Sequence, residues 1–128
     1  RVYADNTAVG GATGSSLSVS RTGERFLVDA AHAYSSSFSS LGTLSAGETL
    51  TAGVITQDGK RVYAYADSGK LYAFDLDTFG VGGIQQVAGS PIMLSNTVGN
   101  SPVMTVSVDG RTVFIAGDDR VIVQPAPP

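Results

Sequence analysis

One stretch, residues 54–74, constrains the fold most, because it places two tight turns between runs with the length and composition of β-strands. The runs at 61–65 and 70–74 are rich in β-branched and aromatic residues, and neither is long enough for a stable helix. Gln57-Asp58-Gly59-Lys60 contains an Asp-Gly pair, which suits the positive φ angles of a hairpin turn. Asp67-Ser68-Gly69-Lys70 has similar turn chemistry. The stretch therefore predicts a three-stranded antiparallel meander.

The third run predicts a sheet with two apolar faces. Alternation along a strand puts Leu71 and Ala73 on one face and Tyr72 and Phe74 on the other. This pattern is typical of a sheet that is covered on both sides. Aromatic residues at strand spacing usually pack one sheet against the next, so we expect core packing rather than a ligand-stacking platform. The expectation applies to Tyr63, Tyr65, Tyr72, Phe74 and Phe114.

Weaker copies of the same unit lie on either side. Residues 16–29 repeat its first two strands with Thr-Gly in the turn, and residues 103–123 repeat all three strands with Asp-Gly. The turn glycines Gly23, Gly59 and Gly110 are 36 and 51 residues apart, with a mean of about 43. This mean is close to the spacing of β-propeller blades, roughly 40 to 50 residues.

The copies divide the chain into units and connectors. In the first unit we expect a third strand near 33–38 and a brief fourth strand within 41–47, whereas the second unit has its fourth strand near 84–87. The third unit lacks a fourth strand in its own sequence. The predicted parts are the end of a preceding unit with a connector at 1–14, units at 15–48, 49–88 and 102–124, a loop-rich insertion at 89–101 and a Pro-rich linker at 125–128 that cannot continue a sheet.

The best-preserved positions resemble the WD40-like and YVTN-like β-propeller repeats. They are Thr56, Asp58, Gly59, Lys60, Val62, Tyr63, Asp67, Ser68, Gly69, Leu71, Tyr72, Phe74, Asp75 and Thr78, with Ser107, Asp109, Gly110, Arg111, Val113, Phe114, Gly117 and Val121 in the last unit. The chain departs from the WD40 pattern because it has no Trp, and from the YVTN pattern because Ala stands for Asn in Tyr63-Ala64-Tyr65-Ala66.

The resemblance implies an all-β fold made of antiparallel meander blades. About two and a half blades are present by this reading, whereas closed propellers have four to eight, so an incomplete propeller is expected. A small β-sandwich or barrel built from the same hairpins is the structural alternative.

Composition excludes several classes of function. Eight Lys and Arg residues oppose eleven Asp and Glu residues, and the basic residues do not cluster, so nucleic-acid binding is not expected. The absence of Cys excludes thiolate metal sites and cysteine nucleophiles. No apolar run is long enough for a transmembrane helix. A charged fraction of only 15% with sixteen Gly favours an extracellular, periplasmic or cell-surface protein.

Four candidate sites have simpler structural interpretations. His32 lies near Asp29 and many serines, but no Gly-x-Ser-x-Gly elbow marks a nucleophile, so we expect a loop histidine. Residues 75–80 open like a calcium loop but have Phe79 where an oxygen ligand is needed, which favours a turn. Asp118 and Asp119 form an acidic pair at a turn, where solvated carboxylates are usual. Residues 10–16 are glycine-rich without the Lys of a phosphate loop, which favours a connector.

These observations predict a non-catalytic binding or scaffold segment with no cofactor and no metal. Propellers bind through the loops at the ends of their strands, so a protein or glycan partner is expected at the loops that carry Asp67, Asp118, Asp119 and His32. One alternative is a fragment of a propeller enzyme, either a lactonase-like hydrolase or a quinoprotein-like oxidoreductase. Another is a structural subunit that associates through open sheet edges, with other blades of the same protein or further copies of the chain as its partners.

Overall fold

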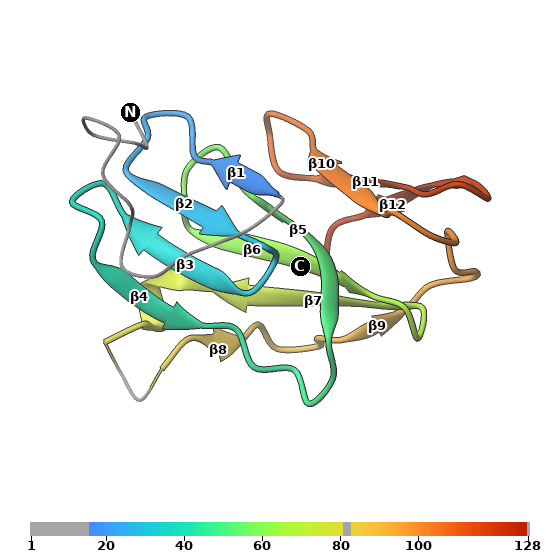
Figure 1. The fold of residues 1–128 in the computed structure, drawn as a ribbon, viewed down its shortest axis with the longest axis horizontal. Helices are drawn as coiled ribbons and strands as arrows, with labels where there is room; N and C mark the ends of the chain where they lie inside the picture. The colour runs from blue at the N-terminus through green and yellow to red at the C-terminus, as the bar shows by residue number, and fades with distance from the viewer. Residues whose placement is uncertain (1–15, 81–82, 128) are drawn as a thin grey trace.

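The computed structural model describes residues 16–80 and 83–127, which form three antiparallel β-sheets (Figure 1). The first sheet contains β1 (Leu17–Val19), β2 (Arg25–Val28), β3 (His32–Ser35) and β4 (Ser40–Thr43). The central sheet contains β5 (Leu50–Ile55), β6 (Arg61–Ala66), β7 (Lys70–Asp75), β8 (Gln85–Gln86) and β9 (Ile92–Met93). The third sheet contains β10 (Val103–Val106), β11 (Thr112–Ala116) and β12 (Val121–Pro125).

Each sheet contains a meander whose strands pair in chain order, as the turn chemistry predicts, and in the central sheet β9 pairs additionally with β7. The predicted all-β fold of antiparallel meanders is confirmed, and the described sheets do not close into a barrel. Within residues 16–80 and 83–127 the structure also has one 3-10 turn, η2 (Leu76–Thr78), which Asp75 caps by accepting a hydrogen bond from the Asp77 amide. No helix among the described residues is long and apolar enough to cross a membrane.

The first turn of every sheet has the same backbone geometry. Gly23, Gly59 and Gly110 have φ angles of 75°, 73° and 74°, and each amide donates to the carbonyl three residues before it. A left-handed conformation of this kind is accessible to glycine without steric cost. The three predicted copies of the hairpin therefore share one turn conformation.

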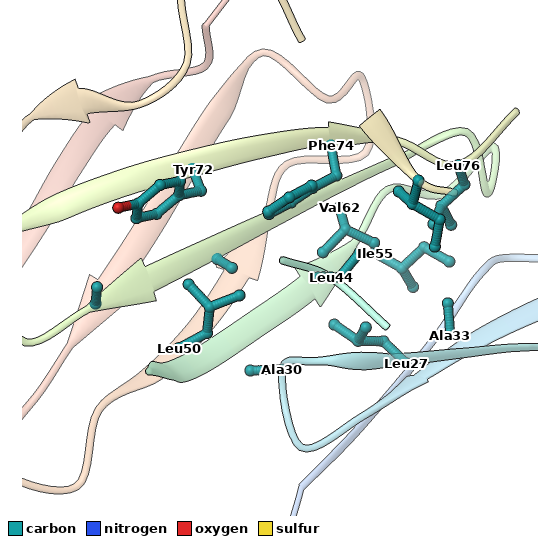
Figure 2. Close-up of a cluster of buried hydrophobic side chains, with 13 residues drawn as sticks. Leu27, Ala30, Ala33, Leu44, Leu50, Ile55, Val62, Tyr72, Phe74 and Leu76 are labelled. Carbon is teal, nitrogen blue, oxygen red and sulfur yellow. The ribbon is translucent and has the colours of Figure 1, made fainter. Parts of the chain in front are cut away.

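The first core joins the first sheet to the central sheet. Figure 2 shows Tyr72 and Phe74 of β7 directed toward the layer that carries Leu27 and Ala33. All four side chains are buried, as are the neighbours Ala30, Leu44, Leu50, Ile55, Val62, Ala64, Ala66, Leu76 and Ile84. Removing this much apolar surface from water is the main stabilising contribution to the contact between the two sheets.

The second core joins the opposite face of the central sheet to the third sheet. Leu71 and Ala73 of β7 are fully buried there, with Val113 and Ile115 of β11. The cluster also contains Ala52, Val54, Tyr63, Tyr65, Leu94, Val98 and Val106. Both faces of the central sheet are therefore covered, and the expectation that its tyrosines and Phe74 pack in the core is confirmed. Phe114 differs, because its side chain is only half-buried.

Several predicted boundaries need correction. The third strand of the first sheet is β3, shorter than the predicted 33–38, because Phe38 has φ 66° in the turn to β4. The predicted insertion 89–101 contains β9, which pairs with the β7 residues Lys70 and Leu71 and so belongs to the central sheet. The predicted end of a preceding unit with its connector at 1–14 falls outside the described residues.

The predicted Pro-rich linker is also incorrect at its start. Pro125 pairs with Thr112 as the last residue of β12, and the Ala126 amide donates to the Arg111 carbonyl. Hydrogen-bonded and non-hydrogen-bonded pairs alternate along an antiparallel ladder, so Pro125 and Thr112, next to the bonded pair Ala126 and Arg111, form a non-hydrogen-bonded pair. The Pro125 nitrogen therefore faces the open edge of the sheet, where no N–H donor is needed. Pro127 is buried, and its carbonyl accepts from Arg61 at 2.9 Å.

Candidate functional site

The first strands of the three sheets, β1, β5 and β10, converge on a shared trough. β5 contacts both β1 and β10. Ser18 and Ile55 connect β1 to β5, because the Ile55 amide donates to the Ser18 hydroxyl at 3.0 Å. The trough has a volume of about 470 Å³. Its lining is Ser16, Leu17, Ser18, Val19, Thr51, Ala52, Gly53, Val54, Ile55, Gln57, Pro102, Val103, Met104, Thr105 and Val106.

The three first strands run in the same direction. Their starting residues line a second cavity of about 460 Å³ that shares Ser16, Thr51, Pro102 and Val103 with the trough. At the far end, the Arg21 amide donates to the Gln57 carbonyl at 2.9 Å and so joins the first turns of two sheets. In each meander the turn between the second and third strands lies at the end where the first strand starts. These turns therefore lie at the end of the trough that carries the second cavity, and we call this end the mouth.

Among the residues that the structure describes, the lining of the trough carries no ionisable side chain. Hydroxyl groups from Ser16, Thr51 and Thr105 alternate with apolar side chains, of which Leu17 is 53% exposed and Val103 is 65% exposed. Such a surface offers neutral hydrogen-bonding groups and apolar contacts. It is therefore suited to an uncharged ligand rather than to an ion.

Backbone groups at the three sheet edges add to this surface. In β5 the Thr56 amide donates to the Arg61 carbonyl, so by antiparallel alternation the N–H and C=O groups of Gly53 and Ile55 point away from β6. The same alternation applies to the other two first strands, where Ser20 bonds to Arg25 and Ser107 to Thr112. The outward-directed residues Leu17, Val19, Gly53, Ile55, Met104 and Val106 all line the trough.

At the mouth, one carboxylate is held in place. Asp29 Oδ1 accepts from the Ser16 amide at 3.1 Å, and the Asp29 amide donates to the Ser16 carbonyl. Asp29 and Ala30, which lie between the hydrogen-bonded Val28 carbonyl and Ala31 amide, have φ angles of 52° and 64°, and positive φ at both central positions is typical of hairpin turns. This turn therefore fixes the start of β1 beside the mouth.

Asp67 lies in the turn between β6 and β7. Its carboxylate accepts from the Thr51 hydroxyl at 3.3 Å, and Thr51 lines the trough. Of the four predicted binding residues, Asp67 is thus the one that contacts the lining directly. The same hydroxyl also donates to the Tyr65 carbonyl at 3.2 Å.

Asp118 and Asp119 lie in the turn between β11 and β12 and hold the preceding loop. Asp118 Oδ1 accepts from the Asn100 amide at 2.8 Å, and the Asp119 amide donates to the Val98 carbonyl at 3.0 Å. A Cβ on Gly99 would clash with the carboxylates of Asp118 and Asp119, so the two side chains enclose this glycine. The pair is exposed but serves the local structure.

His32 is the first residue of β3 rather than a loop residue, and its side chain is exposed. Its Nδ1 lies 3.4 Å from the Thr43 hydroxyl of β4. In the described part of the chain, no hydrogen bond or ion pair joins any two of the four predicted binding residues, and no group of three His, Asp or Glu side chains could hold a metal ion. The four residues share the mouth end without forming one cluster.

At the opposite end, Asp58 and Asp109 stabilise the first turns of their sheets. Asp58 Oδ1 accepts from the Thr56 hydroxyl at 2.6 Å and from the Lys60 amide at 3.0 Å. These bonds lower the pKa of the Asp58 carboxyl. Asp109 has the same relationship to Ser107, and its pKa is lowered for the same reason. The aspartates of this turn motif are therefore structural.

Sequence reasoning missed two features. The trough depends on strands from three separate repeats, and the only local signal was the mixture of Ser, Thr and apolar residues in the first strands. The second is the buried Tyr72 hydroxyl, which donates to the Glu48 carboxylate. This bond raises the pKa of Tyr72 to about 12, and Lys70 Nζ lies 3.9 Å from the same carboxylate.

Comparison with known proteins identifies a shared fold. No family model matches the chain. No curated protein matches it either. Among solved structures, a chain of Kuenenia stuttgartiensis hydrazine synthase superposes with a TM-score of 0.60 at 15% sequence identity over 86% of this chain. The aligned part is 32% of that chain, so the protein described here spans about a third of its length.

Proposed function

We propose that this chain is a non-catalytic binding or scaffold segment of β-propeller type, and that its ligand lies in the trough. The observation that carries the proposal is the convergence of β1, β5 and β10, the first strands of three successive meanders, on one uncharged groove. In a propeller the first strand of each blade lines the central channel, and the strand ends carry the binding loops. The composition supports placing the protein outside the cytoplasm, at the cell surface or in an exported form.

The chemistry of the trough favours an extended, uncharged polypeptide segment of a protein partner. The outward backbone groups of Gly53 and Met104 can exchange hydrogen bonds with another backbone. Leu17 and Val103 provide exposed apolar contacts. A glycan is less well matched, because none of the described residues that line the trough has an aromatic side chain on which a sugar ring could stack.

A binding selection tests the proposal. Peptides that bind the chain are selected from a displayed random library, and sugars are screened on a glycan array. The affinity of each ligand for the unmodified chain is then compared with its affinity for the variants Leu17→Lys and Val108→Lys. Both residues are exposed apolar side chains, but Val108 lies in the turn between β10 and β11 at the far end. We expect Leu17→Lys to weaken peptide binding by roughly tenfold or more, because a charge is placed in an apolar contact, whereas Val108→Lys has no effect.

The predicted loop residues provide a second set of variants. Asp67→Ala removes the acceptor of the Thr51 hydroxyl and is expected to weaken binding at the mouth. Asp118→Ala tests whether the turn between β11 and β12 contributes to binding, and His32→Ala tests the start of β3. Equal binding by Leu17→Lys and the unmodified chain, with no loss in any of the three turn variants, would exclude this trough and its mouth as the binding site.

A further inference from the structure

Arg25 and Arg61 occupy the same position in two successive sheets, because each is the first residue of a second strand, β2 or β6. Arg25 reaches across to the central sheet, where its Nη1 donates to the Asp77 carboxylate at 2.8 Å and to the Gly59 carbonyl at 3.1 Å. One arginine therefore joins the first sheet to a turn and to a carboxylate of its neighbour. We call this contact between the first and central sheets the first junction.

Arg61 has different partners at the second junction, which lies between the central and third sheets. Its Nη1 donates to the Pro127 carbonyl at 2.9 Å and to the Tyr63 hydroxyl at 3.5 Å. Pro127 occupies the position in the third sheet that Asp77 occupies in the central sheet, since each comes two residues after the residue that pairs with the start of the second strand. Within the described part of the chain, no carboxylate forms an ion pair with Arg61. Arg61 therefore lacks the counter-charge that Arg25 has.

The second junction is also more open than the first. A Cβ on Gly59 would lie 3.3 Å from Ser20 Cβ and 3.8 Å from Arg25 Cδ. A Cβ on Gly110, the equivalent turn glycine of the third sheet, would have one described neighbour within 4 Å, which is Thr56 Cγ2 at 3.9 Å. The space between the two turns is a cavity of about 270 Å³, which we call the junction pocket.

The junction pocket carries charges of both signs. Its lining includes Arg61 and Lys60 of the central sheet, together with Asp58 and Asp109 from the first turns of the central and third sheets. Each aspartate uses Oδ1 to hold its own turn, and in residues 16–80 and 83–127 no hydrogen bond uses either Oδ2. Hydrogen bonds from a hydroxyl and a backbone amide lower the pKa of both carboxyls, so both are charged at neutral pH. Cations and carboxylates in one pocket are complementary to a ligand that has both charges.

We propose that the junction pocket binds a small zwitterion with one carboxylate and one ammonium group, such as a free α-amino acid. The ligand carboxylate stands beside Arg61 as the Asp77 carboxylate stands beside Arg25. A guanidinium is suited to this role because its planar N–H groups match the two oxygens of a carboxylate. The ammonium group donates to the Oδ2 atoms of Asp58 and Asp109, in charge-assisted hydrogen bonds.

The size and rim of the pocket limit the ligand further. A volume of about 270 Å³ is slightly below the roughly 300–1,000 Å³ of sites for drug-sized ligands, so the ligand is small. Val108, which is 74% exposed, adds an apolar contact for an aliphatic side chain. The inference goes beyond the proposed function, because the trough is uncharged and, of the described residues, only Gln57 lines both the trough and the junction pocket.

Titration of the ¹⁵N-labelled chain with four small probes tests the proposal. Glycine and L-leucine carry both charges, whereas isocaproate is leucine without the ammonium group and isoamylamine is leucine without the carboxylate. We expect glycine and leucine to shift the amides at 57–60 and 108–110, and each single-charge analogue to bind more weakly than leucine by roughly tenfold or more, because one set of charged groups is left unpartnered. The absence of shifts with both zwitterions would overturn the proposal. Equal affinity of leucine and either analogue would also overturn it.

Variants of the second junction test the position of the ligand carboxylate. Arg61→Gln removes the guanidinium, and Pro127→Asp supplies the carboxylate that the first junction has, so each should weaken leucine binding by roughly tenfold or more. Arg111→Gln is the matched control, because Arg111 is exposed in the same turn as Asp109 but does not line the pocket. Unchanged affinity in both Arg61→Gln and Pro127→Asp would overturn the assignment. Leu17→Lys in the trough should leave leucine binding unchanged, so the two binding proposals succeed or fail independently.

Discussion

Gly53 on β5 lies so close to Ala30, in the turn between β2 and β3, that a Cβ on Gly53 would sit 2.9 Å from the Ala30 Cα. The same Cβ would lie 2.9 Å from Leu27 Cδ2. The missing side chain therefore sets the distance between the first sheet and the central sheet. It also sets the position of β1 beside β5, which forms one wall of the trough.

Replacing Gly53 with Ala should separate these two sheets. We expect Gly53→Ala to lower the free energy of unfolding by about 1–3 kcal/mol, because backbone atoms of the neighbouring turn must move to accept the methyl group. Gly80→Ala is the control, since Gly80 is exposed and a Cβ there meets nothing within 4 Å. Urea unfolding of both variants measures the difference, and equal midpoints would contradict the close approach.

The Tyr72–Glu48 bond makes stability sensitive to alkaline pH. The folded-state pKa of Tyr72 is about 12, above the ordinary value of 10.0, so the folded protein retains a proton that the unfolded chain loses. This contribution is fully present below pH 10 and is lost as the pH rises toward 12. The free energy of unfolding, measured with denaturant across this pH range, should decrease less in Tyr72→Phe than in the unmodified chain. A parallel decrease in both proteins would exclude Tyr72 as the source.

The first hairpin turn can be improved by copying the other two. Thr22 occupies the position in the first turn that Asp58 and Asp109 occupy in the other two. Each of those aspartates accepts one hydrogen bond from a hydroxyl and one from a backbone amide. Thr22→Asp should place a carboxylate beside the Ser20 hydroxyl and raise the free energy of unfolding by about 0.5–1.5 kcal/mol. Thr22→Ala serves as the control without an acceptor.

The pH dependence of that gain identifies its origin. Asp58 and Asp109 have lowered pKa values, so their contribution is present above the ordinary Asp value of 3.8 and is lost as the pH falls below it. The advantage of Thr22→Asp over Thr22→Ala should disappear in the same acidic range. A gain that persists after the carboxyl is protonated would indicate another cause, such as a change in turn propensity.

Arg25 connects the first sheet to the central sheet. Its Nη1 donates to Asp77 at 2.8 Å and to the Gly59 carbonyl at 3.1 Å. Because Asp77 is 53% exposed, a double-mutant cycle between Arg25→Ala and Asp77→Ala should give a coupling of only about 0.2–1 kcal/mol that decreases with added salt. A coupling that salt leaves unchanged would argue against an exposed ion pair.

The hairpins were predictable because their signals are local. Asp58-Gly59 and Asp67-Ser68-Gly69 specify turns without reference to the rest of the chain, and the alternation in β7 correctly assigns Tyr72 and Phe74 to one core and Leu71 and Ala73 to the other. These features depend on residues two to four positions apart. Tertiary contacts reinforce them and do not override them.

The trough and the shorter strands could not be predicted because they depend on contacts far apart in sequence. β9 contains two residues after Pro91 and forms only by pairing with Lys70 and Leu71. Pro125 continues β12 because its nitrogen faces an open edge, which the sequence does not reveal. Asp67 contacts the lining of the trough through Thr51, a residue of another strand, whose hydroxyl donates to the Asp67 carboxylate.

The most direct test of the trough is amide chemical-shift mapping. The ¹⁵N-labelled chain is titrated with the tightest peptide from the library selection, and shifts are recorded for the whole backbone. The outward amides of Leu17, Val19, Gly53 and Met104 should show the largest changes, together with Asp67 at the mouth. Changes confined to the far-end turns at 57–60 and 108–110, with the first strands unaffected, would contradict a binding site in the trough.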